Sequence, residues 1–174
     1  MNFFQKALTE FVSKKLSKDK KTIQLAKLFA EESGKKIICC EAPVPLLKAL
    51  LKEKPSRLLA VAQTESKEQK KLAKTGKHMI SFEGTLSQIQ DRVFDLGVVC
   101  PETLLTEDLE QWLSDAYRLV KAGGNLVFVA PPQTNLYTDL IKHSLKKSGF
   151  GEIRFLCDSH YSVVLCKKDK EGTE

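Results

Sequence analysis

The period of the hydrophobic positions changes repeatedly along the chain, between that of a helix and that of a buried strand. In residues 3–16 and 21–32 apolar side chains recur every three or four positions, which predicts two N-terminal helices. After Gly34 short apolar runs alternate with amphipathic segments, and we expect a strand for each run and a helix for each segment. The expected strands are 36–40, 57–62, 78–82, 94–100 and 125–130, and the expected helices are 45–53, 65–74, 107–120 and 135–148.

Strands that alternate with helices predict an α/β fold in which helices cover both faces of a mostly parallel sheet. The runs LGVVC and LVFVA are apolar throughout, as is typical of central strands that are buried on both sides. Two last strands, 152–157 and 161–166, are joined by a short turn and predict an antiparallel hairpin at one sheet edge. The Lys-Ala-Gly-Gly sequence at 121–124 is expected to end the helix before it, because glycine favours the conformation of a helix C-terminus.

We expect one α/β domain, because no repeat, low-complexity stretch or linker divides the chain. It spans residues 35–168, with the N-terminal helical pair of residues 1–34 packed on it and a charged tail at 169–174. No apolar run approaches the ~20 residues that a membrane span needs. The five cysteines form no Cys-x-x-Cys pair, which predicts free buried thiols, a reducing compartment and a cytoplasmic location.

The net charge is +6, and the kind of basic residue matters for the choice of partner. Only four of the 28 basic residues are arginine, the side chain whose forked donors suit specific phosphate and base contacts. Lysines spread along a sequence are most simply a solvated surface. RNA stays open as an alternative partner, because a basic protein attracts it.

Residues 94–132 carry the most specific pattern in the chain, FDLGVVCPETLLTEDLEQWLSDAYRLVKAGGNLVFVAPP. Its FDL opening and its RLVKAGGNLVFV segment resemble the fourth strand, fourth helix and fifth strand of the class I S-adenosylmethionine-dependent methyltransferases. The closing LKKSGFGEIRFLCDSHYSVVLCKK is similar to the last helix and hairpin of that family. The resemblance covers residues 35–168 and implies a three-layer Rossmann-like methyltransferase fold, with S-adenosylmethionine as the cofactor.

In that family the first strand ends in a glycine-rich turn, which packs against the methionine part of the cofactor. Aligned on the strand, Glu41, Pro43 and Pro45 stand in the glycine positions, and Ala42 lies between them. Side chains then occupy a place of close backbone approach, and proline has no N–H group to donate. Alternatively the two prolines begin the following helix, where proline is favourable at the first position. Glu41 and Ala42 are the turn residues that would contact a cofactor.

The second and third strands of the family end in acidic residues that hold the ribose and lie near the adenine. Here the second strand ends in Ala62, which has no side-chain acceptor, so Gln63 or Glu65 is the available substitute. A helix N-terminus in the same stretch is the competing interpretation. After the third strand Thr85 offers one polar contact to the adenine, although a simple turn explains it equally well.

The fourth strand ends in Cys100 and a proline, where amino- and nucleobase-methylating members carry Asn/Asp-Pro-Pro-aromatic. That target-holding motif is absent from this chain. Cys100 is interpreted as a buried structural thiol, with a nucleophile beside the cofactor as the alternative. Asp95 is expected to be a structural carboxylate. The three histidines, His78, His143 and His160, lack ligand spacing, so we assign no metal site and no catalytic residue.

Two functional hypotheses follow from this pattern. In the first, the chain is a methyltransferase-like domain with a degraded cofactor site, which acts by binding a protein partner. In the second, it is an active but atypical methyltransferase on RNA or a small molecule, with Glu41, Ala42, Gln63, Thr85 and Cys100 around the cofactor. A Rossmann-like binder of another nucleotide is a weaker third, since a pyrophosphate also needs the missing glycine turn.

Overall fold

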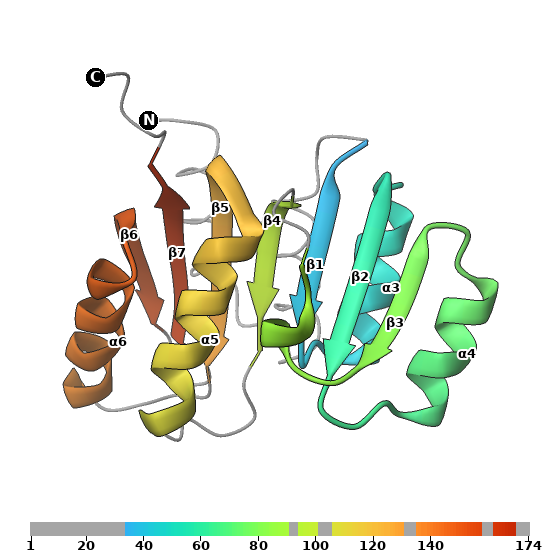
Figure 1. Cartoon of the computed structure of the whole chain (residues 1–174), viewed down its shortest axis with the longest axis horizontal. Coiled ribbons are helices and arrows are strands. Elements are labelled where there is room, and N and C mark those ends of the chain that lie inside the picture. The colour runs from blue at the N-terminus through green and yellow to red at the C-terminus, as the bar shows by residue number, and fades with distance from the viewer. Residues whose placement is uncertain (1–33, 91–93, 101–105, 131–134, 158–161, 170–174) are drawn as a thin grey trace.

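The structure is a computed structural model, which describes residues 34–90, 94–100, 106–130, 135–157 and 162–169. Its strands are β1 Lys36–Cys40, β2 Arg57–Ala62, β3 Met79–Glu83, β4 Phe94–Val99, β5 Val120–Ala130, β6 Phe150–Cys157 and β7 Ser162–Lys168. They form one seven-stranded sheet in the order β3-β2-β1-β4-β5-β7-β6 (Figure 1). β1 to β5 pair in parallel, whereas β7 runs antiparallel to both β5 and β6.

Helices cover both faces of the sheet. They are α3 Val44–Lys52, α4 Lys67–Thr75, α5 Thr106–Leu119 and α6 Asn135–Lys147, with a short 3-10 helix, η1, at Leu86–Gln88. α3 and α4 pack on one face through side chains such as Leu47 and Leu72, while α5, α6 and η1 pack on the other. Figure 1 shows α5 and α6 in front of the sheet and α3 behind it. These layers confirm the expected three-layer Rossmann-like fold with its C-terminal antiparallel hairpin.

The two ends of the chain are described only in small part. The predicted helical pair of residues 1–34 lies outside the described residues except for Gly34, and the predicted tail at 169–174 does so except for Asp169. Both stay predictions. In the part of the chain that the structure describes, no helix has the length and apolar character that crossing a bilayer requires.

β1 shows how completely the centre of the sheet is buried. Ile37 and Cys39 point into the core beneath α3 and α4, whereas Ile38 and Cys40 point into the core beneath α5 and α6. All four side chains are at most 5% exposed. Burial of one large aliphatic side chain contributes about 1.5–3 kcal/mol, so a polar residue inside this strand would be costly. The first polar side chain after β1 is therefore the one that follows its end, Glu41.

The helix ends before residues 121–124 as predicted, and Gly123 has a φ of 76°, in the left-handed region that glycine favours. The strand that follows starts earlier than the expected residue 125, because residues 120–124 are already part of β5. β5 begins at Val120, directly after the last residue of α5. The Nζ atom of Lys168 in β7 donates hydrogen bonds to the carbonyl oxygens of Tyr117 (2.9 Å) and Val120 (3.1 Å). A lysine distant in sequence thus binds the carbonyl groups that a glycine cap would otherwise satisfy.

Asp95 is a structural carboxylate at the amino end of β4, as expected. Its Oδ2 atom accepts a hydrogen bond from the backbone N–H of Lys36 (2.8 Å), and its Oδ1 atom pairs with the ammonium group of Lys121. Partial burial by itself raises the pKa of Asp95, but the hydrogen bonds from Lys121 and Lys36 and the charges of Lys121 and Lys35 outweigh it. The pKa of Asp95 therefore lies below its usual value, and the carboxylate holds the starts of three strands together.

We expect the substitution Asp95→Asn to remove an acid-sensitive part of the stability. A carboxyl group with a depressed folded-state pKa stabilises the fold above its unfolded pKa of about 3.9, and this contribution is lost as the pH falls through the folded-state pKa. Urea unfolding from neutral to acid pH should show the wild type more stable than the variant near neutrality, with the difference shrinking in acid. A difference in the free energy of unfolding that does not change with pH would contradict this account.

Candidate functional site

The carboxyl ends of β1 to β4 meet along one edge of the sheet, at the lower side in Figure 1. In open parallel sheets ligands bind beyond this edge, where the connecting loops supply polar groups. Glu41 and Ala42 follow β1, while Gln63 follows β2, Thr85 follows β3 and Cys100 follows β4. The fold therefore brings all five sequence candidates to the same edge, which we call the carboxyl edge.

The turn after β1 is closed by the side chain of Glu41. This residue has a φ of 53°, in the left-handed region that glycine favours, and its N–H donates to the carbonyl of Val61 (2.9 Å). Its Oε1 atom accepts a hydrogen bond from the backbone N–H of Gln63 (2.6 Å). The backbone thus adopts a conformation typical of a glycine turn, but a carboxylate extends from the end of β1 to the end of β2.

The two prolines begin α3, which is the second of the two interpretations considered for them. Pro43 is the N-cap, with φ −66° and ψ 149°, and Pro45 lies in the first turn. The N–H groups of Leu46 and Leu47 donate to the carbonyl of Pro43 (2.9 and 3.2 Å). Both prolines remove N–H groups from the helix N-terminus, so this end of α3 is a poor site for an anionic ligand.

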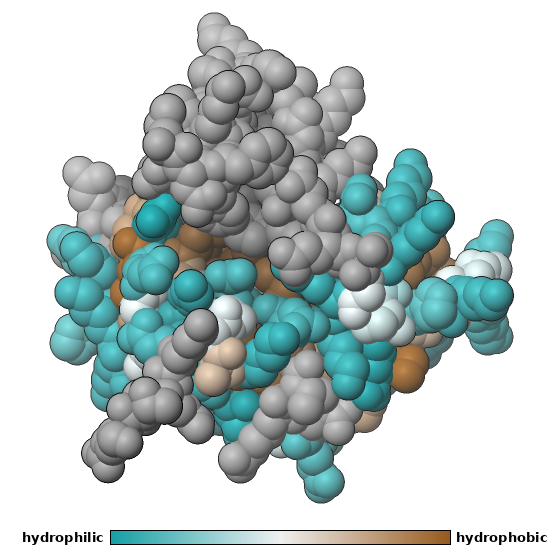
Figure 2. All heavy atoms as spheres, turned by 90° about the horizontal axis from the view of Figure 1, so that it is seen from above, coloured by the Kyte–Doolittle hydropathy of each residue, from teal (hydrophilic) through white to brown (hydrophobic). Residues whose placement is uncertain are grey.

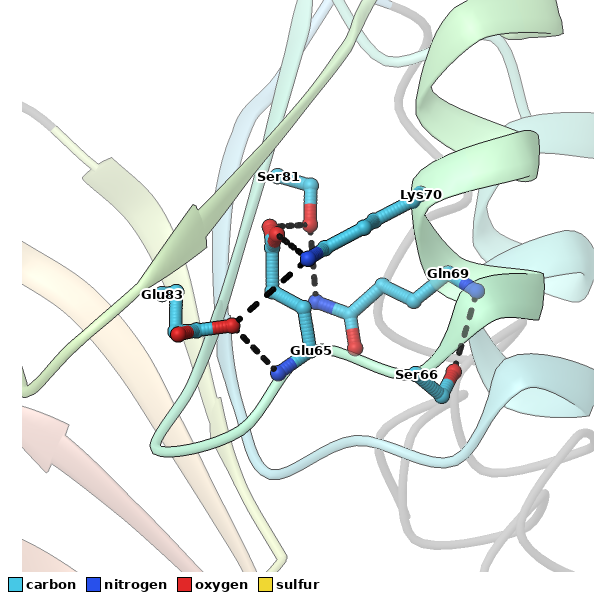
Figure 3. A network of polar contacts seen from close by, with 6 residues as sticks. All are labelled: Glu65, Ser66, Gln69, Lys70, Ser81 and Glu83. Atoms are coloured by element: carbon cyan, nitrogen blue, oxygen red, sulfur yellow. Dashed lines mark hydrogen bonds and ion pairs between the residues drawn. The ribbon is translucent and has the colours of Figure 1, made fainter.

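Glu65, the other candidate for a ribose contact, is held by β3 and α4. Figure 3 shows its side chain directed toward Ser81 and Lys70. Its Oε1 atom accepts from the hydroxyl group of Ser81, its Oε2 atom lies 3.6 Å from Nζ of Lys70, and its side chain is only 11% exposed. Lys70 also lies 3.8 Å from Glu83, whose Oε2 atom accepts from the backbone N–H of Glu65 (3.2 Å).

The start of α4 completes this network. Ser66 is the N-cap, and its Oγ atom accepts from the backbone N–H of Gln69 (3.0 Å). The buried side-chain amide of Gln69 donates to Oγ of Ser81 (3.0 Å). The helix-cap interpretation of this stretch is thus correct. Glu83 stands where the family resemblance places an acidic residue after the third strand, whereas Ser81 belongs to no motif, and its one signal in the sequence is the alternation of apolar and polar residues in ISFE.

Thr85 is engaged within its own turn. Its hydroxyl group lies 2.6 Å from that of Ser87, and its N–H donates to Oε1 of Gln88 (2.9 Å). Gly84 before it has a φ of 152°, and a Cβ atom there would lie 2.2 Å from the same Gln88 oxygen. The turn after β3 is therefore closed by its own side chains.

Arg118 of α5 fixes the segment that follows this turn. Its Nη1 atom donates to the carbonyl of Ile89 (2.7 Å) and its Nη2 atom to that of Leu86 (3.0 Å). Asp115, one turn earlier on the helix, lies 3.5 Å from the guanidinium group. η1 is thus held against α5 by the forked donors of one arginine.

The cysteines at the carboxyl edge are protonated core residues. Cys100 is 9% exposed, and its N–H donates to the carbonyl of Cys40 (2.9 Å). Burial raises the pKa of both Cys40 and Cys100 to about 12, and it raises that of Cys39 as well. A thiol with such a pKa carries almost no thiolate at neutral pH, which makes Cys100 a poor nucleophile.

No group of three or more His, Cys, Asp or Glu side chains in the described ranges could hold a metal ion. His78 and His143 are both exposed, and His160 lies outside the described residues. The described carboxylates at the carboxyl edge are those of Glu41, Glu65 and Glu83, and each already accepts a hydrogen bond within the protein.

No family model matches the sequence, and no curated protein matches it either. Solved structures match by fold. An S-adenosylmethionine-dependent O-methyltransferase from Thermotoga maritima aligns with a TM-score of 0.72 at 13% identity, over 98% of this chain and 73% of that one. The magnesium protoporphyrin IX methyltransferase from Synechocystis, solved with bound S-adenosylmethionine, gives 0.70 at 14% identity over 97% and 85%. The tRNA (m1A58) methyltransferase from Aquifex aeolicus gives 0.69 at 16% identity over 94% and 76%.

These likenesses bear out the resemblance at the level of fold, which is that of the class I methyltransferases. Identities of 13–16% say nothing about which chemistry is retained, because function depends on the site and not on the scaffold.

Two substitutions at Glu41 separate the effect of its carboxylate from that of its backbone strain. Alanine removes the hydrogen bond to Gln63 but keeps the strain, so we expect Glu41→Ala to lower the free energy of unfolding by about 1–3 kcal/mol. Glycine removes both, and relief of the left-handed strain, about 1–2 kcal/mol, should make Glu41→Gly the more stable variant. Urea unfolding of the three proteins measures both differences. Equal stability of the two variants would refute the strain at this turn.

The thiols provide a separate test of Cys100. In a Cys157→Ser background, we expect the remaining four thiols to react slowly with an aromatic disulfide reagent in the native state, because those at the carboxyl edge are buried and protonated. All four should react at once in denaturant. Rapid native modification mapped to Cys100 would instead support the nucleophile interpretation.

Proposed function

We propose that this chain is a methyltransferase-like domain with a degraded cofactor site, which acts by binding a partner and not by methyl transfer. The observation that carries the proposal is the hydrogen bond from the Gln63 N–H to the Glu41 carboxylate. It joins the ends of β1 and β2, where the family resemblance locates the methionine and ribose parts of the cofactor.

A cofactor would have to compete with this internal contact. A hydrogen bond to a charged group contributes about 1.5–3 kcal/mol, and a ligand that displaces it must supply an equivalent bond. The side chain of Glu41 also fills space that a glycine would leave open for close backbone approach. The turn is thus supported by its own contacts and does not need a ligand to be satisfied.

Two of the three groups considered for the ribose contact are absent or already engaged. Ala62 has no side-chain acceptor at the end of β2. The Glu65 carboxylate is bound to Ser81 and lies near Lys70, and withdrawing it would leave the Ser81 hydroxyl without its acceptor and Lys70 with Glu83 as its remaining partner. The backbone N–H of Gln63 is already used by Glu41, which leaves the exposed side-chain amide of Gln63 as the remaining candidate.

The second candidate function is an active, atypical methyltransferase. One observation favours it, the left-handed turn at Glu41, which retains the backbone course of a glycine turn and holds a carboxylate at the carboxyl edge. In that case Glu41 would face the positive sulfonium of S-adenosylmethionine, and the amide of Gln63 would meet the ribose.

Calorimetric titration with S-adenosylmethionine, and separately with S-adenosylhomocysteine, distinguishes these functions. We expect no heat and no rise in the melting temperature at millimolar ligand, because the polar groups at the carboxyl edge are bonded to each other. A catalytically active methyltransferase of the same fold, titrated in the same buffer, is the positive control.

A micromolar dissociation constant, equivalent to roughly 8 kcal/mol of binding, would overturn the degraded-site proposal. The variant Glu41→Gln would then test the alternative. If the carboxylate faces the sulfonium, this variant should bind S-adenosylmethionine more weakly, with a smaller change for other ligands that lack the positive charge, such as S-adenosylhomocysteine.

A further inference from the structure

The opposite edge of the sheet, where the parallel strands begin, gathers positive charge. Five exposed lysines lie there, in the segments that begin β1, that end α3 and that lead from α4 into β3. We call them the basic edge: Lys36, Lys52, Lys54, Lys74 and Lys77. Figure 2 looks down on this side of the molecule and shows hydrophilic side chains at the right, where β2, β3 and α4 lie in Figure 1.

Backbone contacts place the segments of the basic edge next to one another. The N–H of Gly34 donates to the carbonyl of Lys54 (3.4 Å), which joins the start of β1 to the end of α3. The N–H of Leu58 donates to the carbonyl of His78 (2.8 Å), which joins the start of β2 to the residue after Lys77.

The ends of the two helices also meet at this edge. A Cβ atom on Gly76, after α4, would come within 3.3 Å of Cδ1 of Leu51 in the last turn of α3. Lys52 and Lys74 therefore belong to neighbouring helix ends, at the same edge of the sheet as the other three lysines.

Two acidic residues lie beside these lysines, Glu53 between Lys52 and Lys54 and Asp95 at the start of β4, where Asp95 pairs with Lys121. None of the five lysines of the basic edge forms an ion pair with another described residue. Residues 34–90 contain 11 Lys and Arg against 5 Asp and Glu, whereas residues 91–174 contain 10 against 13. The positive charge is thus unevenly distributed between the two halves of the domain.

Helix stability explains only part of the basic edge. Lys52 and Lys74 lie in the last turns of α3 and α4, where a cation is favourable beside the helix C-terminus. Lys36 and Lys77 lie outside the helices. Lys54 has a φ of 54°, at a left-handed position after α3 where glycine would be more favourable.

We propose that the basic edge binds the phosphodiester backbone of a nucleic acid without reading its sequence. Lysine is a flexible point charge that neutralises single phosphates, whereas base recognition favours the fork of arginine. A row of lysines that form no ion pair within the described ranges suits a chain of regularly spaced phosphates, and release of condensed counterions would drive the association.

The described surface favours this partner over a protein or a membrane. Protein interfaces are built around apolar and aromatic anchors, and membrane-surface segments insert apolar side chains. In the described ranges the exposed large hydrophobic residues are Ile80 and Leu140, neither of which belongs to the basic edge. The proposal does not rest on the state of the cofactor site, because the carboxyl edge lies at the other end of the strands.

Fluorescence anisotropy with labelled RNA and with duplex DNA of equal length, at several salt concentrations, tests the proposal. We expect the double variant Lys54→Gln/Lys77→Gln to bind about tenfold or more weakly at low salt. The slope of log K against log salt should become shallower by about 0.7–0.9 for each phosphate that the variant no longer neutralises. The two probes distinguish single-stranded or folded RNA from duplex DNA as the preferred backbone.

The matched control is Lys142→Gln/Lys146→Gln, which removes the same charge from two exposed lysines of α6 on the other side of the sheet. It should bind as the wild type does, and thermal melting should show both double variants folded. Equal weakening in the two variants, or no salt-dependent binding to either probe, would overturn the proposal. So would binding to phosphatidylserine vesicles or polyglutamate in place of nucleic acid.

Discussion

Burial of the central parallel strands on both faces governs where this molecule can carry polar chemistry. Ile37 to Cys40 alternate between two cores, so neither face of β1 tolerates a charge. Charged and hydrogen-bonding side chains are therefore found where the strands begin or end. A strand of five or six residues is about 17–20 Å long, and this length separates the carboxyl edge from the basic edge.

Several polar groups at the carboxyl edge bind one another. An enzyme site leaves donors and acceptors directed at the place of the ligand, often at a cost in stability. Here the Glu41 carboxylate binds the Gln63 N–H, Glu65 binds Ser81, and the Thr85 N–H binds Gln88. The contacts close the turns after β1, β2 and β3 in succession. These contacts stabilise the three turns from within the protein.

The scaffold could be predicted from the sequence because its signals are local. Apolar runs such as LGVVC specify strands, and the element order specifies the sheet. The contacts of the site could not be predicted in this way. Glu41 meets the Gln63 N–H only because β1 and β2 pair in a particular register. The contacts that hold the end of α5 could not be predicted from local pattern either, since Lys168, far along the chain, supplies hydrogen bonds to the carbonyl groups of Tyr117 and Val120.

The same topology brings lysines that look scattered in the sequence to one edge of the sheet. In a parallel α/β unit each helix runs opposite to its strands, so the end of a helix always returns to the edge where the next strand begins. Lys52 and Lys54 close the first such return, and Lys74 and Lys77 close the second. Residues about 20 positions apart, close to the repeat of one strand-helix unit, therefore become neighbours in space. Along the sequence these lysines appear to be an ordinary solvated surface. The fold concentrates them at one edge. This placement, and not their number, favours a polyanionic partner.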